Sequence, residues 1–367
     1  MKGKKTTTGA KKTTTTTTKT TGKAPVAQKT STTTKTAPAT KKNTKAADNK
    51  GTDKRAFVSH ESQKKVQNVE IVKKSNMKCI KTINAHEDWV EKVRLLSNGK
   101  IITASQDGLI KSWDVLKDDK ALSICEGHSG PVMDIIEFGK DQIISVSKDK
   151  SIRKWNVSTG KELYCYEMDG PVYCVKKIND KLIAVGGADK SIRILDFSQN
   201  IKNEEESEIE VAKLEGHTDE ITDLETGNNM LISSSMDKTI ILWDLGNYKL
   251  IKKLQGHSEG VKCLKFLKEG NLASGGFDNV IKIWDLKKFT CIKTLSGHTG
   301  HVFAVNQLPD GRIVSGASDW SIIVWNTEKG IPDFTLEGHE EAVYSIEILP
   351  DGKIVSGSVD HHIKLWN

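Results

Sequence analysis

The chain has 367 residues and a formal net charge of +7 at pH 7. No apolar run approaches the ~18 residues that a membrane-spanning helix needs, so the sequence predicts no such span. It also shows neither the apolar stretch of a secretory signal nor the Arg-rich amphipathic pattern of a transit peptide. The six cysteines have no CxxC spacing, which favours a reduced compartment. We expect an intracellular protein, cytoplasmic or nuclear, with the cytoplasm slightly favoured.

Residues 1–55 differ in kind from the rest of the chain. They hold 15 Lys or Arg, 2 Asp and 19 Thr, so they cannot bury enough apolar surface to offset the entropy of ordering. We predict a disordered tail with a charge of +13, and residues 56–367 carry the difference between +7 and +13, which is −6. The basic balance therefore describes the tail, and the folded body is acidic.

The Lys/Thr-rich tail resembles linker-histone-like or microtubule-contacting tails, which would bind a polyanion by salt-sensitive charge neutralisation. Phosphorylation of its threonines would weaken that attraction. The alternative, which we favour, is a solubilising extension. Residues 56–78 stay undecided, because Val66, Val69, Ile71 and Val72 could form either a short strand or a helix against the body.

From Cys79 onward the chain repeats. Short alternating strands recur in units that end on Trp113, Trp155, Leu195, Trp243, Trp284, Trp325 and Trp366, at spacings of 42, 40, 48, 41, 41 and 41 residues. Gly-His pairs precede most units, at His128, His217, His257, His298 and His339, and Trp-Asp pairs end those at Trp113, Trp243 and Trp284. Residues 79–367 therefore resemble the WD40 family. The resemblance implies an all-β, seven-bladed propeller and leaves the function open, because this fold hosts many roles.

The last unit, residues 338–367, holds only three strands, whereas every earlier unit has a fourth. A bare sheet edge invites another strand. The segment 79–83, CIKTI, nearly repeats the fourth strand at 291–295, CIKTL. We therefore predict that this early segment completes the last sheet and closes the ring.

The spacing of 48 residues marks an insertion at 198–210, SQNIKNEEESEIE, between the third and fourth strands of the third unit. The propeller layout would place this loop on the bottom face. We interpret it as a solvated acidic loop. The alternative is a docking site for a basic partner, including the chain's own tail, at low or moderate salt.

Six units carry a His, a Ser or Thr, an Asp and a Trp at fixed offsets. Because Trp N–H only donates while hydroxyl and neutral imidazole do both, the four can form one satisfied chain from Trp through the hydroxyl and His to Asp. The third unit has Met168, Val185, Asp189 and Leu195 instead, as expected if the network is lost all at once. The sets are His86, Thr103, Asp107 and Trp113; His128, Ser145, Asp149 and Trp155; His217, Ser233, Asp237 and Trp243; His257, Ser274, Asp278 and Trp284; His298, Ser315, Asp319 and Trp325; His339, Ser356, Asp360 and Trp366.

These sets also resemble a Ser-His-Asp hydrolase triad. We reject that interpretation, because six identical copies would mean six active sites without an oxyanion arrangement. His301, His361 and His362 lack the carboxylate or Cys spacing of a metal site. We expect no enzyme activity, no metal and no cofactor.

In WD40 propellers the top face, which carries the Gly-His loops and the turn aspartates, does most of the recognition. The resemblance places these candidate partner-binding residues on it: Trp89, Glu91, Met133, Lys148, Lys150, Tyr173, Lys190, Lys238, Lys262, Phe277, His301, Phe303, Trp320, Tyr344 and His361. Trp89 and Trp320 are the two tryptophans outside the six networks. The aromatic residues come from units five, six, seven and one, and the lysines fill the opposite arc.

We therefore expect an aromatic patch beside a basic crescent, suited to a peptide with an apolar anchor and acidic or phosphorylated residues. The alternative is that these side chains only cap the channel. The preferred function is a non-catalytic scaffold or adaptor, a monomeric propeller within a larger protein complex and away from membranes. Two alternatives stay open: a nucleic-acid- or chromatin-associated protein that uses the tail, and the substrate-recognition subunit of a ubiquitin ligase.

Overall fold

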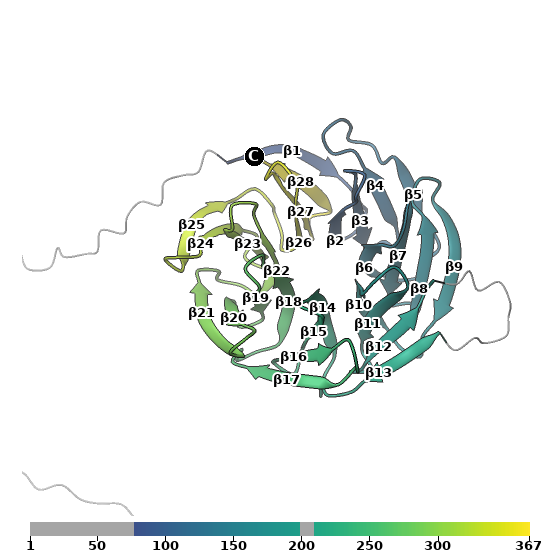
Figure 1. The fold of residues 1–367 in the computed structure, drawn as a ribbon. Helices are drawn as coiled ribbons and strands as arrows, with labels where there is room; N and C mark the ends of the chain where they lie inside the picture. The colour runs from purple at the N-terminus through teal and green to yellow at the C-terminus, as the bar shows by residue number, and fades with distance from the viewer. Residues whose placement is uncertain (1–76, 199–208) are drawn as a thin grey trace, which may run out of the picture. The chain divides into compact units, whose positions relative to one another are not determined.

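The computed structural model describes residues 77–198 and 209–367. The predicted tail at 1–55, the segment 56–76 and most of the acidic insertion lie outside the described residues. Between residues 77 and 367, outside that gap, the chain forms seven four-stranded antiparallel sheets. Figure 1 looks down the axis around which these sheets are set as blades. The described ranges contain no helix long and apolar enough to span a bilayer.

The blades follow one another along the chain. Blade 1 is β2 (Val90–Leu95), β3 (Ile101–Ser105), β4 (Ile110–Trp113) and β5 (Ser123–Cys125); blade 2 is β6 (Val132–Glu137), β7 (Gln142–Ser147), β8 (Ser151–Asn156) and β9 (Lys161–Glu167); blade 3 is β10 (Val172–Lys177), β11 (Leu182–Gly187), β12 (Ile192–Asp196) and β13 (Glu210–Leu214); blade 4 is β14 (Ile221–Gly227), β15 (Met230–Ser235), β16 (Thr239–Asp244) and β17 (Leu250–Gln255).

The remaining three blades repeat this order. Blade 5 is β18 (Val261–Phe266), β19 (Leu272–Gly276), β20 (Val280–Asp285) and β21 (Thr290–Ser296); blade 6 is β22 (Val302–Gln307), β23 (Ile313–Ala317), β24 (Ile322–Asn326) and β25 (Ile331–Leu336); blade 7 is β26 (Val343–Ile348), β27 (Ile354–Ser358), β28 (His362–Trp366) and β1 (Cys79–Asn84). In each blade the first strand in this order lies nearest the axis and the last lies on the perimeter (Figure 1).

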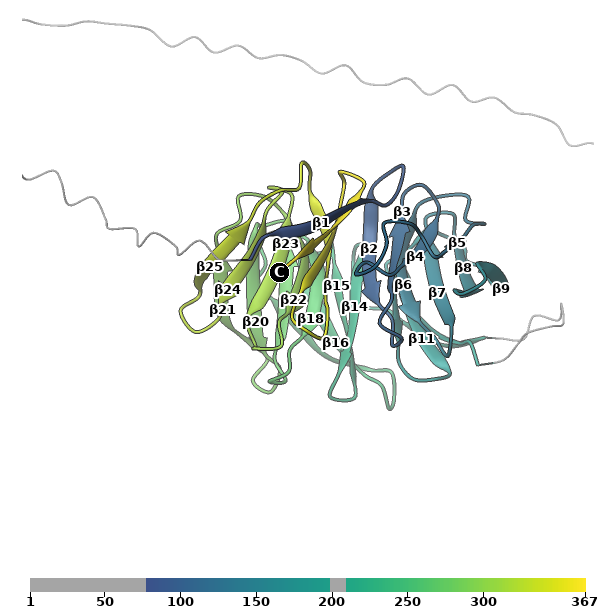
Figure 2. The same cartoon turned by 90° about the horizontal axis from the view of Figure 1, so that it is seen from above.

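The ring closes through β1, as the sequence predicted. β1 pairs antiparallel with β28, with Lys81 opposite Leu365 and Ile83 opposite Ile363. Lys78 and Asn367 exchange two backbone hydrogen bonds, of 2.8 and 3.1 Å. Both views place β1 along the outer edge of blade 7, before the chain enters blade 1 (Figures 1 and 2). The bare edge of the last three strands is thereby covered.

The core lies between neighbouring blades. At the closure, Ile83, Val355 and Ile363 of blade 7 pack with Val93 and Trp113 of blade 1 in one buried cluster. The second strand of each blade is the most buried, and all five residues of β3, β19, β23 and β27 are buried. Burial on both faces explains why these strands carry continuous small and apolar residues.

The Gly-His pairs need glycine because a side chain at this position would crowd the tryptophan ring of the same blade. A Cβ built on Gly127 would lie 3.1 Å from the Trp155 ring, and one on Gly256 would lie 3.1 Å from the Trp284 ring. Both backbones also have φ near +157°, a conformation that glycine adopts readily. The loop can therefore pass over the tryptophan edge and deliver its histidine into the blade.

Candidate functional site

The polar sets of six blades form hydrogen-bonded chains. The Trp Nε1 donates to the hydroxyl oxygen at 2.7–2.9 Å, and the hydroxyl lies 2.7–2.8 Å from the His Nε2. The His Nδ1 lies 2.7–3.0 Å from the nearer Asp oxygen. Since an ionised carboxylate can only accept, the imidazole must carry its proton on Nδ1, and its Nε2 then accepts from the hydroxyl, which itself accepts from the Trp N–H.

Each network also fixes the loops of the top face. The same carboxylate accepts from the backbone N–H that follows the histidine, at 2.8–3.2 Å. It therefore ties the turn between the second and third strands to the loop that enters the first strand. Two loops of each such blade are held together by a buried polar chain, so the face that they form is preorganised.

The surroundings set the charge states of the network. Burial lowers the pKa of His86, His128 and His339, against the opposing pull of their aspartates, so these imidazoles stay neutral. Burial alone would raise the pKa of Asp107, but its hydrogen bonds to His86 and to backbone N–H groups lower the value to about 2. In blades 1, 2 and 7 the network is therefore built from neutral histidine and ionised aspartate.

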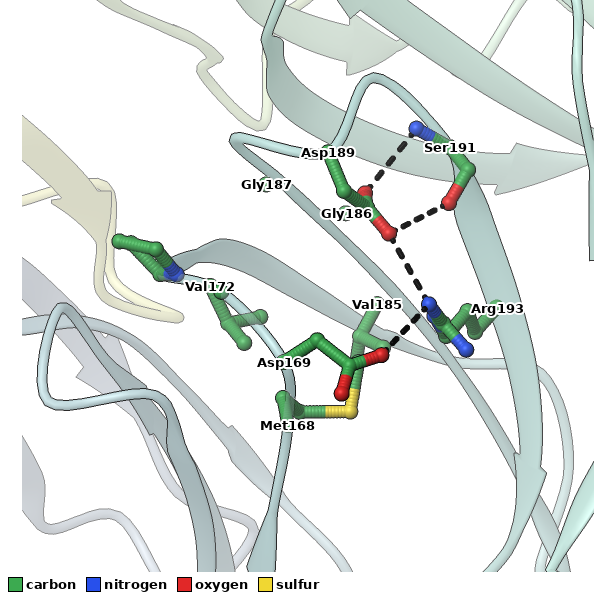
Figure 3. Close-up of a pocket in the computed structure, with 11 residues that line it drawn as sticks. Met168, Asp169, Val172, Val185, Gly186, Gly187, Asp189, Ser191 and Arg193 are labelled. Carbon is green, nitrogen blue, oxygen red and sulfur yellow. Dashed lines mark hydrogen bonds and ion pairs between the residues drawn. The ribbon is translucent and has the colours of Figure 1, made fainter. Parts of the chain in front are cut away.

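Blade 3 holds Asp189 differently, because Met168, Val185 and Leu195 replace the other members of the set. Asp189 accepts from the Ser191 hydroxyl at 2.7 Å and from Arg193 Nη2 at 3.3 Å, and Arg193 also pairs with Asp169 (Figure 3). Outside the view, Arg193 Nη1 pairs with Glu210 as well. In blade 3 the guanidinium of Arg193 therefore donates to the turn aspartate, as a histidine does in the other six blades.

The hollow drawn in Figure 3 lies at this place. Its volume of about 10 Å³ admits roughly one water molecule. The Nε of Arg193 is the only buried side-chain nitrogen or oxygen in the described ranges without a hydrogen-bond partner. One water fits both the space and the free donor, so we assign no ligand to this hollow.

The candidate residues nearest the axis sit on a repeated bulge. In every blade the register between the first two strands shifts by one residue immediately after the first position. A bulge leaves its extra residue outside the ladder and turns its side chain. The bulged residues are Glu91, Met133, Tyr173, Thr222, Lys262, Phe303 and Tyr344.

A second ring of candidates follows the turn aspartates. In all seven blades the next residue has a positive φ, between +65° and +82°. Only blade 1 has glycine there, and the other blades have Lys150, Lys190, Lys238, Asn279, Trp320 and His361. An L-residue in this conformation is disfavoured by roughly 1–2 kcal/mol, most clearly for a bulky side chain. Six side chains therefore occupy a turn position that glycine would adopt more easily.

The structure brings five of the predicted aromatic residues into one row of ring contacts, which we call the aromatic row. Trp89 lies 5.8 Å from Tyr344, and Tyr344 lies 4.5 Å from Phe303, between ring centroids. Phe303 contacts Phe277 at 6.0 Å and His301 at 6.2 Å. The row runs from blade 1 across the closure through blades 7 and 6 to blade 5.

Trp320 lies outside the aromatic row. It makes no ring contact with the described residues, and half of its surface is exposed. His361 likewise stands on its turn without an aromatic neighbour among residues 77–198 and 209–367. The sequence indicated that these residues share a face with the row, but the direction of each side chain depends on the turn.

The predicted lysine arc is partly neutralised. Lys148 and Lys150 are exposed, and no ion pair within the described ranges engages them. Lys190 donates to the Thr218 carbonyl at 3.0 Å, and Lys238 pairs with Glu259 at 3.0 Å. Lys262 is half-buried. Glu259 was not among the predicted residues, although it follows His257 by two positions and so lies on a top-face loop.

Acidic groups also lie among the candidates. Tyr173 donates to Glu220 at 3.4 Å. Glu91 is only 6% exposed, and its Oε1 accepts from Gln106 Nε2 at 2.7 Å. Burial, together with the nearby charge of Glu91, raises the pKa of Tyr344 to about 12. The face therefore carries a buried carboxylate at the end of the aromatic row, which the sequence pattern alone did not indicate.

The described residues contain no group of three or more His, Cys, Asp or Glu side chains that could hold a metal ion. The hydroxyls of the six networks are fully buried between Trp and His. They are committed to hydrogen bonds inside the blades, which is a structural role.

Solved structures and curated sequences match the chain. The WD40 propeller domain of Doa1 matches with a TM-score of 0.70 and 24% identity, over 80% of this chain and 97% of that one. Ribosome biogenesis protein ytm1 of Schizosaccharomyces pombe is 28% identical over 44% of this chain and 43% of its own length. Nuclear distribution protein nudF of Emericella nidulans is 30% identical over 52% and 48%. The chain thus spans less than half the length of these curated relatives.

A family model described as "WD domain, G-beta repeat" matches residues 77–114, 119–156, 209–244, 248–285, 289–326 and 330–367. The unmatched stretch between the second and third matches contains most of blade 3, the blade whose polar network is replaced. The matches cover more than half of the chain. Together with the seven sheets, they establish that the chain belongs to the WD40 family.

Proposed function

We propose that this protein is a non-catalytic scaffold or adaptor that binds a segment of a partner protein on its top face. The observation that carries the proposal is the pair of tryptophans on that face. Trp89 is 36% exposed and Trp320 is 50% exposed, whereas the six network tryptophans are at most 3% exposed. Large exposed aromatic side chains are uncommon on a surface without a partner and are enriched among interface anchors.

The backbone at Trp320 strengthens this interpretation. Its φ of +70° is unfavourable for a bulky residue, and glycine occupies the equivalent position in blade 1. Strained residues that persist in a fold point towards a role other than stability. We propose that Trp320 is an anchor for the partner.

The arrangement of charge suggests an orientation for the bound segment. The aromatic row and Trp320 occupy blades 5, 6, 7 and 1, and the exposed Lys148 and Lys150 of the neighbouring blade 2 form no ion pair within the described ranges. An apolar anchor over the row would place acidic or phosphorylated residues of the same segment towards Lys148 and Lys150.

The curated relatives have names from ribosome biogenesis and nuclear distribution. These names describe different processes, so they favour a general scaffold role and select no partner. The charge of +13 on residues 1–55 supports a second candidate function, association with a nucleic acid. That association would weaken steeply with salt, because it depends on counterion release.

Affinity capture tests the proposal. The full chain, the double variant Trp89→Ala/Trp320→Ala and the control Ile292→Ala/Ile331→Ala would be used as baits in the same extract. Ile292 and Ile331 are 50% and 49% exposed on outer strands, so the control removes similar exposed apolar surface elsewhere. We expect proteins held by the full chain and the control to be lost from the double variant. Equal capture by all three baits would refute the role of this face.

A further inference from the structure

We propose that the top face contains a subsite for a cationic side chain, formed by Glu91 with Trp89, Tyr344 and Phe303. The ligand class is a guanidinium or a methylated ammonium group presented by the bound partner. This inference rests on the proposed function and adds the chemistry of one contact to it.

The first observation is that Glu91, an ionisable residue, is buried, although burying a charged carboxylate is costly. Glutamate is almost never buried unless it is paired with a cation. Glu91 is 6% exposed, and its one hydrogen bond within the described residues comes from the neutral amide of Gln106. No lysine or arginine of the described ranges forms an ion pair with it. An amide satisfies one carboxylate oxygen and leaves the charge uncompensated.

The second observation is that the other carboxylate oxygen keeps contact with solvent. Among the described residues, Arg193 Nε is the only buried side-chain nitrogen or oxygen that lacks a partner. The Oε2 atom of Glu91 has no hydrogen bond of its own, so it cannot be fully buried. Glu91 is the bulged residue of β2, so its side chain stands outside the regular ladder.

The third observation is the ring system beside this carboxylate. Tyr344 contacts Trp89 at 5.8 Å with the ring planes inclined by 47°, and contacts Phe303 at 4.5 Å. Ring faces attract cations within about 6 Å of the centroid, and a neighbouring carboxylate adds to that attraction. The charge of Glu91 acts on Tyr344, so the carboxylate and the ring system that Tyr344 joins both favour positive charge there.

Gln106 holds this arrangement in position. Its backbone N–H donates to the Trp89 carbonyl at 3.0 Å, while its side chain donates to Glu91. The residue after it, Asp107, belongs to the polar network of blade 1. The carboxylate of Glu91 and the backbone of Trp89 are thus held by the same turn, as a preformed site requires.

The experiment uses small probes, because the partner is unidentified. The full chain with ¹⁵N-labelled tryptophan would be titrated with N-acetyl-arginine amide, N-acetyl-trimethyllysine amide and the neutral carbon isostere of trimethyllysine. We expect the Trp89 indole signal to shift with one or both cations, while the signals of Trp320 and the six network tryptophans stay in place. Preference between the two cations would identify the source of the charge.

The variants separate charge from shape. Glu91→Gln preserves size and can still accept from Gln106, so it should fold and bind the cations about tenfold more weakly or worse. The matched control is Glu220→Gln, which removes another top-face carboxylate beside a tyrosine, Tyr173, and should bind like the unmodified chain.

Three results would overturn the inference: no shift at Trp89 with either cation, equal binding by the neutral isostere, or unchanged binding after Glu91→Gln. The proposed function has a separate readout. If the Trp89/Trp320 variant loses partner capture while the cation probes fail to bind, the scaffold role stands and only the cationic subsite is rejected.

Discussion

The adjacent serines Ser233 and Ser234 on β15 offer a test of the polar networks. Both are inaccessible to solvent. Ser233 Oγ accepts from Trp243 Nε1 at 2.9 Å and lies 2.8 Å from His217 Nε2. Ser234 Oγ lies 2.9 Å from the Thr222 hydroxyl, which has a second acceptor in the Val261 carbonyl. The two serines lie on the same strand and are equally buried, but they differ in how many buried polar groups would lose their hydrogen-bond partner if the hydroxyl were removed.

Ser233→Ala would leave the Trp243 N–H and the His217 Nε2 without partners inside the blade. Each unsatisfied buried group costs about 1–3 kcal/mol, so we expect a loss of about 2–6 kcal/mol in the free energy of unfolding. Ser234→Ala leaves no donor unpaired, because Thr222 still donates to the Val261 carbonyl, and should cost about 1 kcal/mol or less.

The two variants and the parent chain would be compared by urea denaturation, with tryptophan fluorescence and circular dichroism as independent probes. Coincident transitions would justify a free energy from the midpoints. Equal midpoints for Ser233→Ala and Ser234→Ala would show that the network adds nothing to stability beyond an ordinary buried serine.

Two further predictions follow from the same geometry. Folding lowers the pKa of His86 and His128, so below pH ~6.5, where free histidine becomes protonated, the unfolded chain binds more protons than the folded chain. We therefore expect the urea midpoint to fall as the pH drops from 7 towards 5. It should fall again between pH 4 and 2, because folding lowers the pKa of Asp107 to about 2 and the unfolded chain takes up that proton first. A midpoint that stays flat between pH 7 and 5 would contradict the neutral assignment. Trp320→Gly should unfold at the same temperature as the parent chain or a higher one, because glycine adopts the local φ without strain, yet it should lose partner capture. Thermal melting at a lower temperature would argue that Trp320 is a packing residue.

Much of the fold was predictable because its signals are local and repeated. The spacing of Trp113, Trp155 and the later tryptophans fixed the number of units, and the similarity of 79–83 to 291–295 predicted the closing strand that now pairs with β28. The polar sets were recognisable because each requires four residue types at constant offsets. In blade 3 the His, Ser and Trp positions are apolar together (Met168, Val185 and Leu195), as expected because losing one member would leave the donors and acceptors of the others unpaired.

The details of the candidate face were not predictable in the same way. Whether Trp89 touches Tyr344 depends on blades 1 and 7, whose inner strands are about 250 residues apart in sequence and meet only at the closure. The separation of Trp320 from the aromatic row depends on a positive φ, and the burial of Glu91 depends on a bulge. The partners of Lys190 and Lys238 come from neighbouring blades. The side-chain contacts between neighbouring blades differ from one pair of blades to the next, whereas the repeat pattern is constant, so the repeat pattern cannot predict these contacts.

The closure positions every contact between blades 7 and 1, including that of Trp89 with Tyr344, and a disulfide test addresses it directly. Thr82 lies opposite Lys364 in the β1–β28 ladder, and Lys364 Nζ donates to Thr82 Oγ1 at 3.1 Å. Cys79 Sγ lies 3.5 Å from Thr82 Oγ1, so Cys79→Ser is included in both variants. The full chain with Thr82→Cys and Lys364→Cys would be oxidised mildly and mapped by mass spectrometry, beside a slipped pair with Thr82→Cys and His362→Cys. The structure predicts a bond between positions 82 and 364 within the monomer and none in the slipped pair. Equal yields from both pairs, or crosslinks only between molecules, would contradict the closed ring.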